Sequence, residues 1–503
     1  MFTFNDVIAR LDRDEAGITF LSATSSVPAF VSYRALGSMV RGNVEHLTSL
    51  GIRRRDRVAV ALETDLEHVV IVLALMAMGA IPVSLKPRRG SIEEHARYVD
   101  ALVRRFDVRW AHWPLPACAG LRSFGWSDGA RSDDASVIAE VEPEDVAFVQ
   151  FSSGSLGDPK AVPIRHESLL ANVRAILELD DRTPGSIGYD FLPLSHDMGL
   201  VGGLLSNLVL QNPLYLSPVQ DFLKRPARFF THVPRFRKVI CPMPDFALRY
   251  LARYLEAKGQ ALDPHLLSCL DTVYCGAEPI RYSTIASLLK LAPRVGFDPT
   301  SLVFCYGMAE ATLLVTAHAF ASLDASFTRG PSGLMTANVG APVDGVELRA
   351  SAAGNLFVRG PCVFRGYLDG PALEGGWHDT GDVGFERDGE IFISGRSKDM
   401  VIVNGENLFP SDIEEIVARV DGVNESLVMS DDDAASGRFY VLVVPKNGCA
   451  PDTREISARI GAEFGAVPAA ISFGPARSIL RTTSGKPMRG ATLDDLRQRG
   501  ALP

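Results

Sequence analysis

Runs of apolar residues that suit buried strands alternate with helical patterns along most of the chain. Residues 56–62 and 83–85 read as strands, while 69–81 and 93–105 read as helices. Strands that alternate with helices need crossover connections, and crossovers place neighbouring strands parallel. The pattern therefore predicts an α/β fold with parallel sheets flanked by helices.

The apolar run at 69–81 is the one stretch that could be interpreted as a membrane-spanning helix. It holds thirteen apolar or small residues, against the roughly 20 that a spanning helix needs, and Gly79 and Pro82 then interrupt it. A buried helix that leads into a strand fits better.

A chain of 503 residues is too long for a single core. Residues 339–397 predict a small β subdomain, because short strand patterns at 346–349, 356–359 and 390–393 follow one another with turns between them. Residues 398–503 predict a separate small α+β domain, which leaves 1–397 as the N-terminal domain. In that last domain, Ser411 and Glu414 predict a capping box at the start of a helix.

Composition excludes several classes of function. The 51 Lys and Arg residues against 60 Asp and Glu give a charge of −9, which disfavours nucleic acid as a partner. The seven cysteines form no Cys-x-x-Cys pair, so we expect no cysteine metal site and a reducing, cytoplasmic location. The first six residues lack a basic start and apolar core, so no secretory signal is predicted.

A polar loop follows the strand pattern at 146–151. Its sequence is Ser152-Ser153-Gly154-Ser155-Leu156-Gly157-Asp158-Pro159-Lys160. Glycines let a backbone curl closely around an anion, and hydroxyls and one ammonium add donors, so the loop suits a phosphate chain. It has neither the Walker A spacing nor the dinucleotide fingerprint, and taken alone it also fits a plain linker.

Further polar turns follow later strand patterns. His196 and Asp197 lie between a strand and an apolar helix, and the turns at 275–279 and 305–310 each carry a carboxylate. Ligands gather at the carboxyl ends of parallel strands, so these turns are expected to face one cleft. Glu310 is a candidate ligand for a magnesium ion that bridges nucleotide phosphates, although each turn is also compatible with an ordinary strand end.

Seven strings in one order resemble the adenylate-forming superfamily, and within it the fatty acyl-AMP ligases. They are FSSGSLGDPK at 151, LPLSHDMGLVGGLL at 192, CGAEPIR at 275, YGMAEATL at 306, DTGDVGF at 379, GRSKDMVIVNGENLFPSDIEE at 395 and TTSGKPMR at 482. The resemblance implies a large N-terminal domain of two mostly parallel sheets, and a C-terminal domain that rotates about Lys398. It implies ATP and Mg²⁺ as cofactors, a carboxylic acid of the fatty type as substrate, and a thiol as acceptor.

The resemblance also implies roles for individual residues. The phosphate loop corresponds to Ser152 through Lys160, and Glu310 to a magnesium-associated glutamate. Asp382 and Arg396 correspond to the pair that holds the ribose hydroxyls, Lys486 to the lysine that reaches the acyl carboxylate and α-phosphate, and His196 to a histidine beside the acyl group. The implied adenine pocket and its neighbours are Gly276, Ala277, Glu278, Tyr306, Gly307 and Met308.

Departures from the family pattern leave alternatives open. Leu156 stands where Thr or Ser is usual and Ala161 where Gly is usual, so slower or more selective adenylation is expected. The segment between Thr316 and Val339 is short for a fatty acyl-AMP ligase. In that family an insertion in the large domain usually disfavours coenzyme A, so the short segment leaves the acceptor open. The favoured acceptor is the phosphopantetheine of a carrier protein, with coenzyme A second. A catalytically silent nucleotide-binding relative is the third hypothesis.

Overall fold

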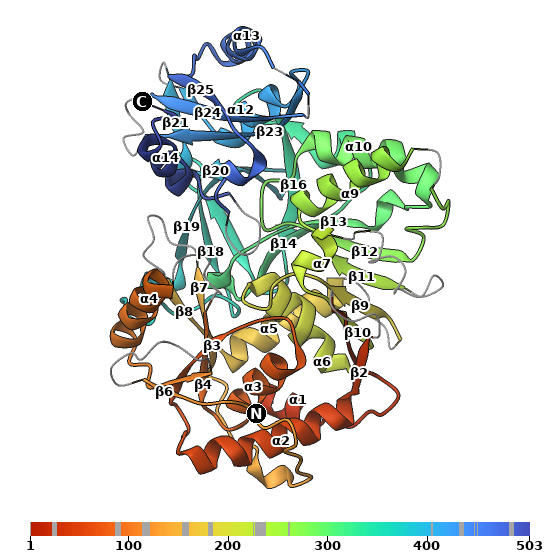
Figure 1. The fold of residues 1–503 in the computed structure, drawn as a ribbon, viewed down its shortest axis with the longest axis vertical. Helices are drawn as coiled ribbons and strands as arrows, with labels where there is room; N and C mark the ends of the chain where they lie inside the picture. Colours follow the sequence, from red (N-terminus) through yellow and green to blue (C-terminus); the bar gives the residue numbers. More distant parts are fainter. Residues whose placement is uncertain are drawn as a thin grey trace.

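The computed structural model of the chain describes residues 2–22, 28–85, 92–112, 121–152, 160–179, 185–224, 226, 238–259, 262–403, 406–431, 437–446, 448–449, 451–481 and 487–502. A large part, built on two sheets, is followed by a smaller C-terminal part (Figure 1). Within these residues no helix combines the length and apolarity needed to cross a bilayer.

The first sheet has six strands in the order β6-β5-β3-β4-β7-β8. Its core is parallel, and β8 pairs antiparallel with β7 at the edge. The strands are β3 (Arg57–Ala61), β4 (Ile81–Leu85), β5 (Trp110–His112), β6 (Arg122–Ser123), β7 (Val146–Ser152) and β8 (Lys160–Arg165). Helices of this region are α1 (Phe4–Ala9), α2 (Tyr33–Leu50), α3 (Leu66–Ala77) and α4 (Ile92–Arg105). The run at 69–81 is thus a helix, α3, that leads into strand β4, and all its residues from Val69 to Ala77 are buried.

The second sheet has fourteen strands and changes character half-way. It is parallel among β1 (Gly17–Phe20), β10 (Leu214–Leu216), β9 (Ile187–Asp190), β11 (Val239–Pro242), β12 (Leu270–Cys275) and β13 (Leu302–Gly307). The pairing is antiparallel in the rest of the sheet. The strands there are β14 (Leu314–Ala319), β15 (Phe327–Arg329), β16 (Met335–Pro342), β17 (Glu347–Ala350), β18 (Asn355–Arg359), β19 (His378–Arg387) and β20 (Glu390–Arg396). At the other end of the sheet, β2 (Ala29–Ser32) pairs antiparallel with β1. The short strands predicted at 346–393 therefore continue the main sheet, in which β19 is a further strand that the sequence did not indicate.

Helices join the strands of this second sheet. They are α5 (His166–Leu179), α6 (Ser206–Leu210), α7 (Val219–Lys224), α9 (Asp245–Lys258), α10 (Tyr282–Val295) and the short α11 (Leu323–Ser326). Before α6, residues Met198–Leu205 form a π-helix, where a regular apolar helix was predicted. π-Helical turns are rare in proteins, and many of those that do occur lie at functional sites.

The C-terminal part is a three-stranded sheet with helices on both faces. Its strands are β23 (Val423–Ser430), β24 (Phe439–Pro445) and β25 (Ala470–Phe473), its helices α12 (Pro410–Val417), α13 (Thr453–Phe464) and α14 (Arg489–Gln498), and β21 (Val401–Val403) pairs with β22 (Glu406–Leu408) in a hairpin. Alternate residues of β24 enter different cores: Val441 and Val443 pack in one, Leu442 and Val444 in the other. This period of two is what a strand covered on both faces requires.

The capping box predicted at Ser411 is wrong. Helix α12 begins at Pro410 after Phe409, without a side-chain cap. Glu414 instead accepts a hydrogen bond from the backbone N–H of Val428, 2.9 Å away on β23. The Glu414 carboxylate thus binds a backbone N–H on another element instead of the backbone at the start of its own helix.

Candidate functional site

One cavity of about 760 Å³ lies where the second sheet meets the C-terminal part. Strands β9, β12 and β13 run parallel and end at it, and β19 and β20 pass along it. The predicted site residues among its lining are His196, Gly276, Ala277, Glu278, Tyr306, Gly307, Met308, Glu310, Asp382, Arg396 and Lys398. The expectation that the polar turns face one cleft is met by this geometry.

Two glycines let the strand ends approach closely at this cavity. A Cβ on Gly276 would lie 2.5 Å from the carbonyl oxygen of Cys305, and a Cβ on Gly307 only 1.8 Å from that of Leu313. Between them, Ala277 has a left-handed φ of 65°, which is uncommon for a residue with a side chain and typical of functional turns.

Tyr306, Asp382 and Arg396 form a connected polar group. The Tyr306 hydroxyl donates to Asp382 Oδ2 at 2.7 Å, and Arg396 Nε lies 3.1 Å from Asp382 Oδ1. Asp382 and Arg396 are directly opposite in the β19–β20 ladder, so sheet register alone brings them together. Burial and the adjacent Asp382 carboxylate raise the pKa of Tyr306 well above its usual range. Burial opposes the charge of Arg396, yet Asp382 raises the pKa of Arg396.

Glu310 and Lys160 meet around the ring of Tyr367. The Tyr367 hydroxyl donates to Glu310 Oε1 at 2.9 Å, and Lys160 Nζ lies 4.9 Å from the Tyr367 ring centroid. His378 is nearby, where burial and Lys160 lower its pKa although Glu310 opposes the shift. This arrangement places one cation over the face of the Tyr367 ring and one carboxylate at its hydroxyl.

A Mg²⁺ ion fits the chemistry of this corner. Among the described residues no group of three or more His, Cys, Asp or Glu side chains could hold a metal. Magnesium in nucleotide sites typically uses one or two carboxylates and completes its shell with phosphate oxygens and water. Glu310, which is almost buried and lines the cavity, supplies one such hard oxygen donor.

His196 and Lys398 also line the cavity. His196 Nδ1 is 2.6 Å from Asp197 Oδ1 at the start of the π-helix. Lys398 follows β20, and partial desolvation together with the Arg396 and Lys160 cations lowers its pKa against the opposing effect of Asp399.

Several predicted residues cannot be placed. Ser152 ends strand β7, while Ser153, Gly154, Ser155, Leu156, Gly157 and Lys486 lie outside the described residues. The neighbouring Arg481 and Pro487 pair in an isolated bridge, and both line the cavity.

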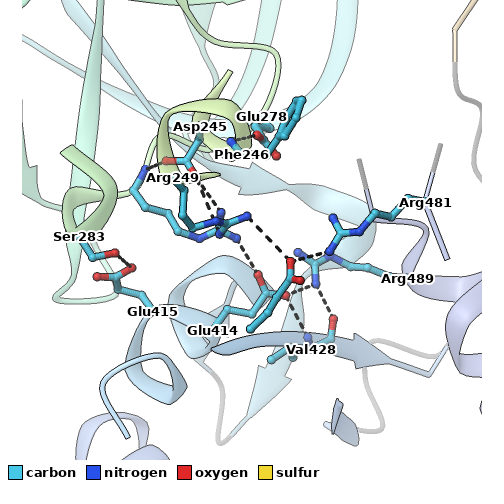
Figure 2. Close-up of polar contacts among 12 residues, drawn as sticks. Asp245, Phe246, Arg249, Glu278, Ser283, Glu414, Glu415, Val428, Arg481 and Arg489 are labelled. Carbon is cyan, nitrogen blue, oxygen red and sulfur yellow. Dashed lines mark hydrogen bonds and ion pairs between the residues drawn. The ribbon is translucent and has the colours of Figure 1, made fainter. Parts of the chain in front are cut away.

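A network of arginines and carboxylates joins the C-terminal part to the rest of the chain (Figure 2). Arg281, which precedes α10, contacts Asp245 Oδ2 at 3.0 Å and Glu414 Oε2 at 3.1 Å. Glu414 is also paired with Arg489 from its own part. The net effect of burial, which opposes ionisation, and of Arg489 and Arg281, which favour it, is a lowered pKa of Glu414.

Glu425 repeats this arrangement on the neighbouring strand β23. It pairs with Arg481 of its own part and lies 3.9 Å from Arg249 on α9, which also approaches Asp245. Sequence reasoning missed these residues as a group. The one available signal was the position of Arg281 at the end of the CGAEPIR string.

The comparisons with known proteins fit this geometry. Residues 19–368 match the AMP-binding enzyme family. The chain belongs to this family. It is 30% identical to a putative acyl-CoA synthetase of Caulobacter vibrioides, with 94% of this chain and 91% of that protein covered. It is 29% identical to the medium-chain-fatty-acid–[acyl-carrier-protein] ligase JamA of Moorena producens, over 56% of this chain and 54% of JamA.

Among solved structures, the chain resembles a fatty acyl-adenylate ligase from a study of the E. coli and L. pneumophila enzymes. The TM-score is 0.85 at 26% identity, with 100% of this chain and 99% of that one covered. This AMP-binding enzyme therefore belongs to the adenylate-forming superfamily near the fatty acyl-AMP ligases, as its motifs predicted, and ATP-dependent activation of an acid is its supported chemistry.

Proposed function

We propose that this AMP-binding enzyme joins a fatty-type carboxylic acid to ATP, forming acyl-AMP and pyrophosphate, and then transfers the acyl group to the phosphopantetheine thiol of a carrier protein. The observation that carries the proposal is the cavity that Tyr306, Asp382, Arg396 and Glu310 line together with residues of the C-terminal part.

The charges of the site suit this reaction. A carboxylate that attacks the α-phosphorus of ATP brings negative charges together, so the site must supply cations and oriented donors. Lys160 adds positive charge near Glu310, Lys398 adds it elsewhere in the cavity lining, and a bound Mg²⁺ would neutralise phosphate charge. We assign Lys486 to the reacting carboxylate and α-phosphate.

Nucleotide binding is assigned to the group around Asp382. Its carboxylate accepts from Tyr306 and faces Arg396, so an acceptor and a planar donor fork lie together for the ribose hydroxyls. No protein nucleophile is needed, because the substrate carboxylate attacks and pyrophosphate leaves.

The test of adenylation is pyrophosphate release from ATP with a panel of carboxylic acids. Lys486→Ala is expected to bind ATP and release almost no pyrophosphate, whereas Lys290→Ala, an exposed lysine on α10, serves as control. Full pyrophosphate release by the Lys486 variant would contradict the assigned role. If the unaltered enzyme converts no acid, the catalytically silent hypothesis prevails.

The acceptor needs a separate experiment. JamA is named a carrier-protein ligase, while the Caulobacter relative is named a putative acyl-CoA synthetase, so coenzyme A is the second candidate. Enzyme that has formed acyl-AMP is offered phosphopantetheinylated carrier protein or coenzyme A, and thioester is measured by mass spectrometry. Thioester on coenzyme A alone would refute the carrier-protein assignment.

A further inference from the structure

Four buried polar side chains line the cavity without complete hydrogen bonding. Within the described part of the chain, five of their atoms have no hydrogen-bond partner. These atoms are the amide nitrogen and oxygen of Gln150, Asp190 Oδ2, Ser195 Oγ and Asn207 Oδ1. None of the four residues is more than 5% exposed. Buried polar groups are nearly always hydrogen-bonded to protein, water or ligand, so this concentration in one cavity indicates a polar occupant.

Asp190 and Asn207 converge on one glycine of the π-helix. Asp190 Oδ1 accepts from the backbone N–H of Leu192, but Oδ2 lies so close to Gly203 that a Cβ there would be 1.9 Å away. Asn207 donates through Nδ2 to the Gly203 carbonyl at 2.6 Å, which leaves its Oδ1 as a spare acceptor. The missing side chain of Gly203 therefore makes the room that these polar groups occupy.

The charge state of these side chains further limits the chemical class of ligand that could bind them. Burial raises the pKa of Asp190 well above its usual range, and the groups that oppose the shift are the backbone N–H groups of Leu192 and Phe191. A protonated Asp190 both donates and accepts, as the Ser195 hydroxyl does, while Asn207 Oδ1 accepts. A neutral group that both donates and accepts matches this set.

We propose that these side chains form the specificity pocket for the acid, and that the pocket selects a carboxylic acid whose chain carries a hydroxyl group. The inference rests on the proposed adenylation and adds its substrate class. A plain alkyl chain would leave every one of these polar atoms unpaired. A hydroxyl can both donate to and accept from these atoms, and an amino-substituted acid is the comparison that tests this choice.

The experiment measures kcat/KM for pyrophosphate release with matched acids. Each pair has the same chain length, with and without a hydroxyl group at one of several positions, and an amino-substituted acid is included. For at least one position the enzyme should prefer the hydroxy acid by about tenfold or more, because polar groups built to pair a hydroxyl reject the analogue that lacks it.

Variants then assign the preference to the pocket. Asp190→Leu and Gln150→Leu replace the polar groups with apolar ones and should each reduce the preference about tenfold or more. Asp190→Asn keeps both a donor and an acceptor and should reduce it less. Thr284→Val is the matched control, because the Thr284 hydroxyl is also buried without a partner among the described residues but lies outside the cavity lining.

The outcomes separate the inference from the function on which it rests. If alkyl acids are converted as well as hydroxy acids, or the preference is unmoved in the Asp190 and Gln150 variants, the inference is wrong and adenylation stands. A preference for the amino-substituted acid also overturns it. If no acid releases pyrophosphate, both proposals fail. Should Asp190→Leu not fold, Gln150→Leu and Asp190→Asn carry the same comparison.

Discussion

Glu414→Gln tests how the C-terminal part is fastened to the rest of the enzyme. The change keeps the size of the side chain and an acceptor for Val428, but it removes the charge that faces Arg281 and Arg489. Breaking a buried ion pair costs about 3–5 kcal/mol. We expect a loss of about 3 kcal/mol in the free energy of unfolding, the lower end of that range, because Arg281 retains Asp245.

The matched control is Glu415→Gln on the same helix. Glu415 accepts one hydrogen bond, from the Ser283 hydroxyl at 2.8 Å, and a glutamine can still accept it. We expect a loss below about 1 kcal/mol for this variant. Urea unfolding followed by far-UV circular dichroism compares the two, and trypsin cleavage near Lys398 reports whether the junction opens. Equal stability of the two variants would refute the assignment of the fastening to Glu414.

The effect of Glu414→Gln should depend on pH in one direction. Burial disfavours the Glu414 carboxylate, but the two arginines and the Val428 N–H lower its pKa below the usual 4.5. The charged group therefore stabilises the folded chain above pH 4.5 and loses this contribution as the pH falls through the folded-state pKa. The difference between native enzyme and variant should be full at pH 7 and shrink in acid; a difference that grows in acid would contradict the sign.

Three further predictions concern the cavity. Asp382→Asn should raise the KM for ATP about tenfold with a smaller change in kcat, because a charge-assisted acceptor for the ribose is lost; steady-state kinetics checks this, and an unchanged KM would argue against ribose binding. Glu310→Gln should raise the Mg²⁺ concentration for half-maximal pyrophosphate release about tenfold, and an unaltered Mg²⁺ titration would remove Glu310 from the metal site. Gly203→Ala should destabilise the enzyme by about 1–3 kcal/mol, because its Cβ would meet Asp190 Oδ2; a melting temperature equal to that of the native enzyme would show that the π-helix moves freely.

The sequence predicts the local features of this fold well. The apolar run at 69–81 forms the buried helix α3 and leads into strand β4, as its length and the break at Gly79 and Pro82 indicate. The strand ends that carry Gly276 and Tyr306 face one cavity because parallel strands share an edge, and this follows from the alternation of elements alone.

Features set by distant partners were beyond a local reading. The capping box predicted at Ser411 is absent because Glu414 is bound by groups on other elements. The π-helix at 198–205 has an apolar sequence that suits a regular helix equally well, so its widening has no periodic signal. Strand β19 carries few apolar alternations, and only its ladder with β20 reveals why Asp382 meets Arg396.

The ion pairs that Glu414 and Glu425 form with arginines affect how easily the C-terminal part separates from the rest of the enzyme. Each acid has one arginine within its own part and a second across the boundary, and Asp245 on the opposite face keeps arginines of its own. Undocking would thus leave Glu414, Glu425 and Asp245 each with an arginine partner on its own side of the boundary. Such a boundary combines attraction between opposite charges when the two parts are docked with ion pairs that remain inside each part when they separate, which suits the rotation about Lys398 that the motifs predict.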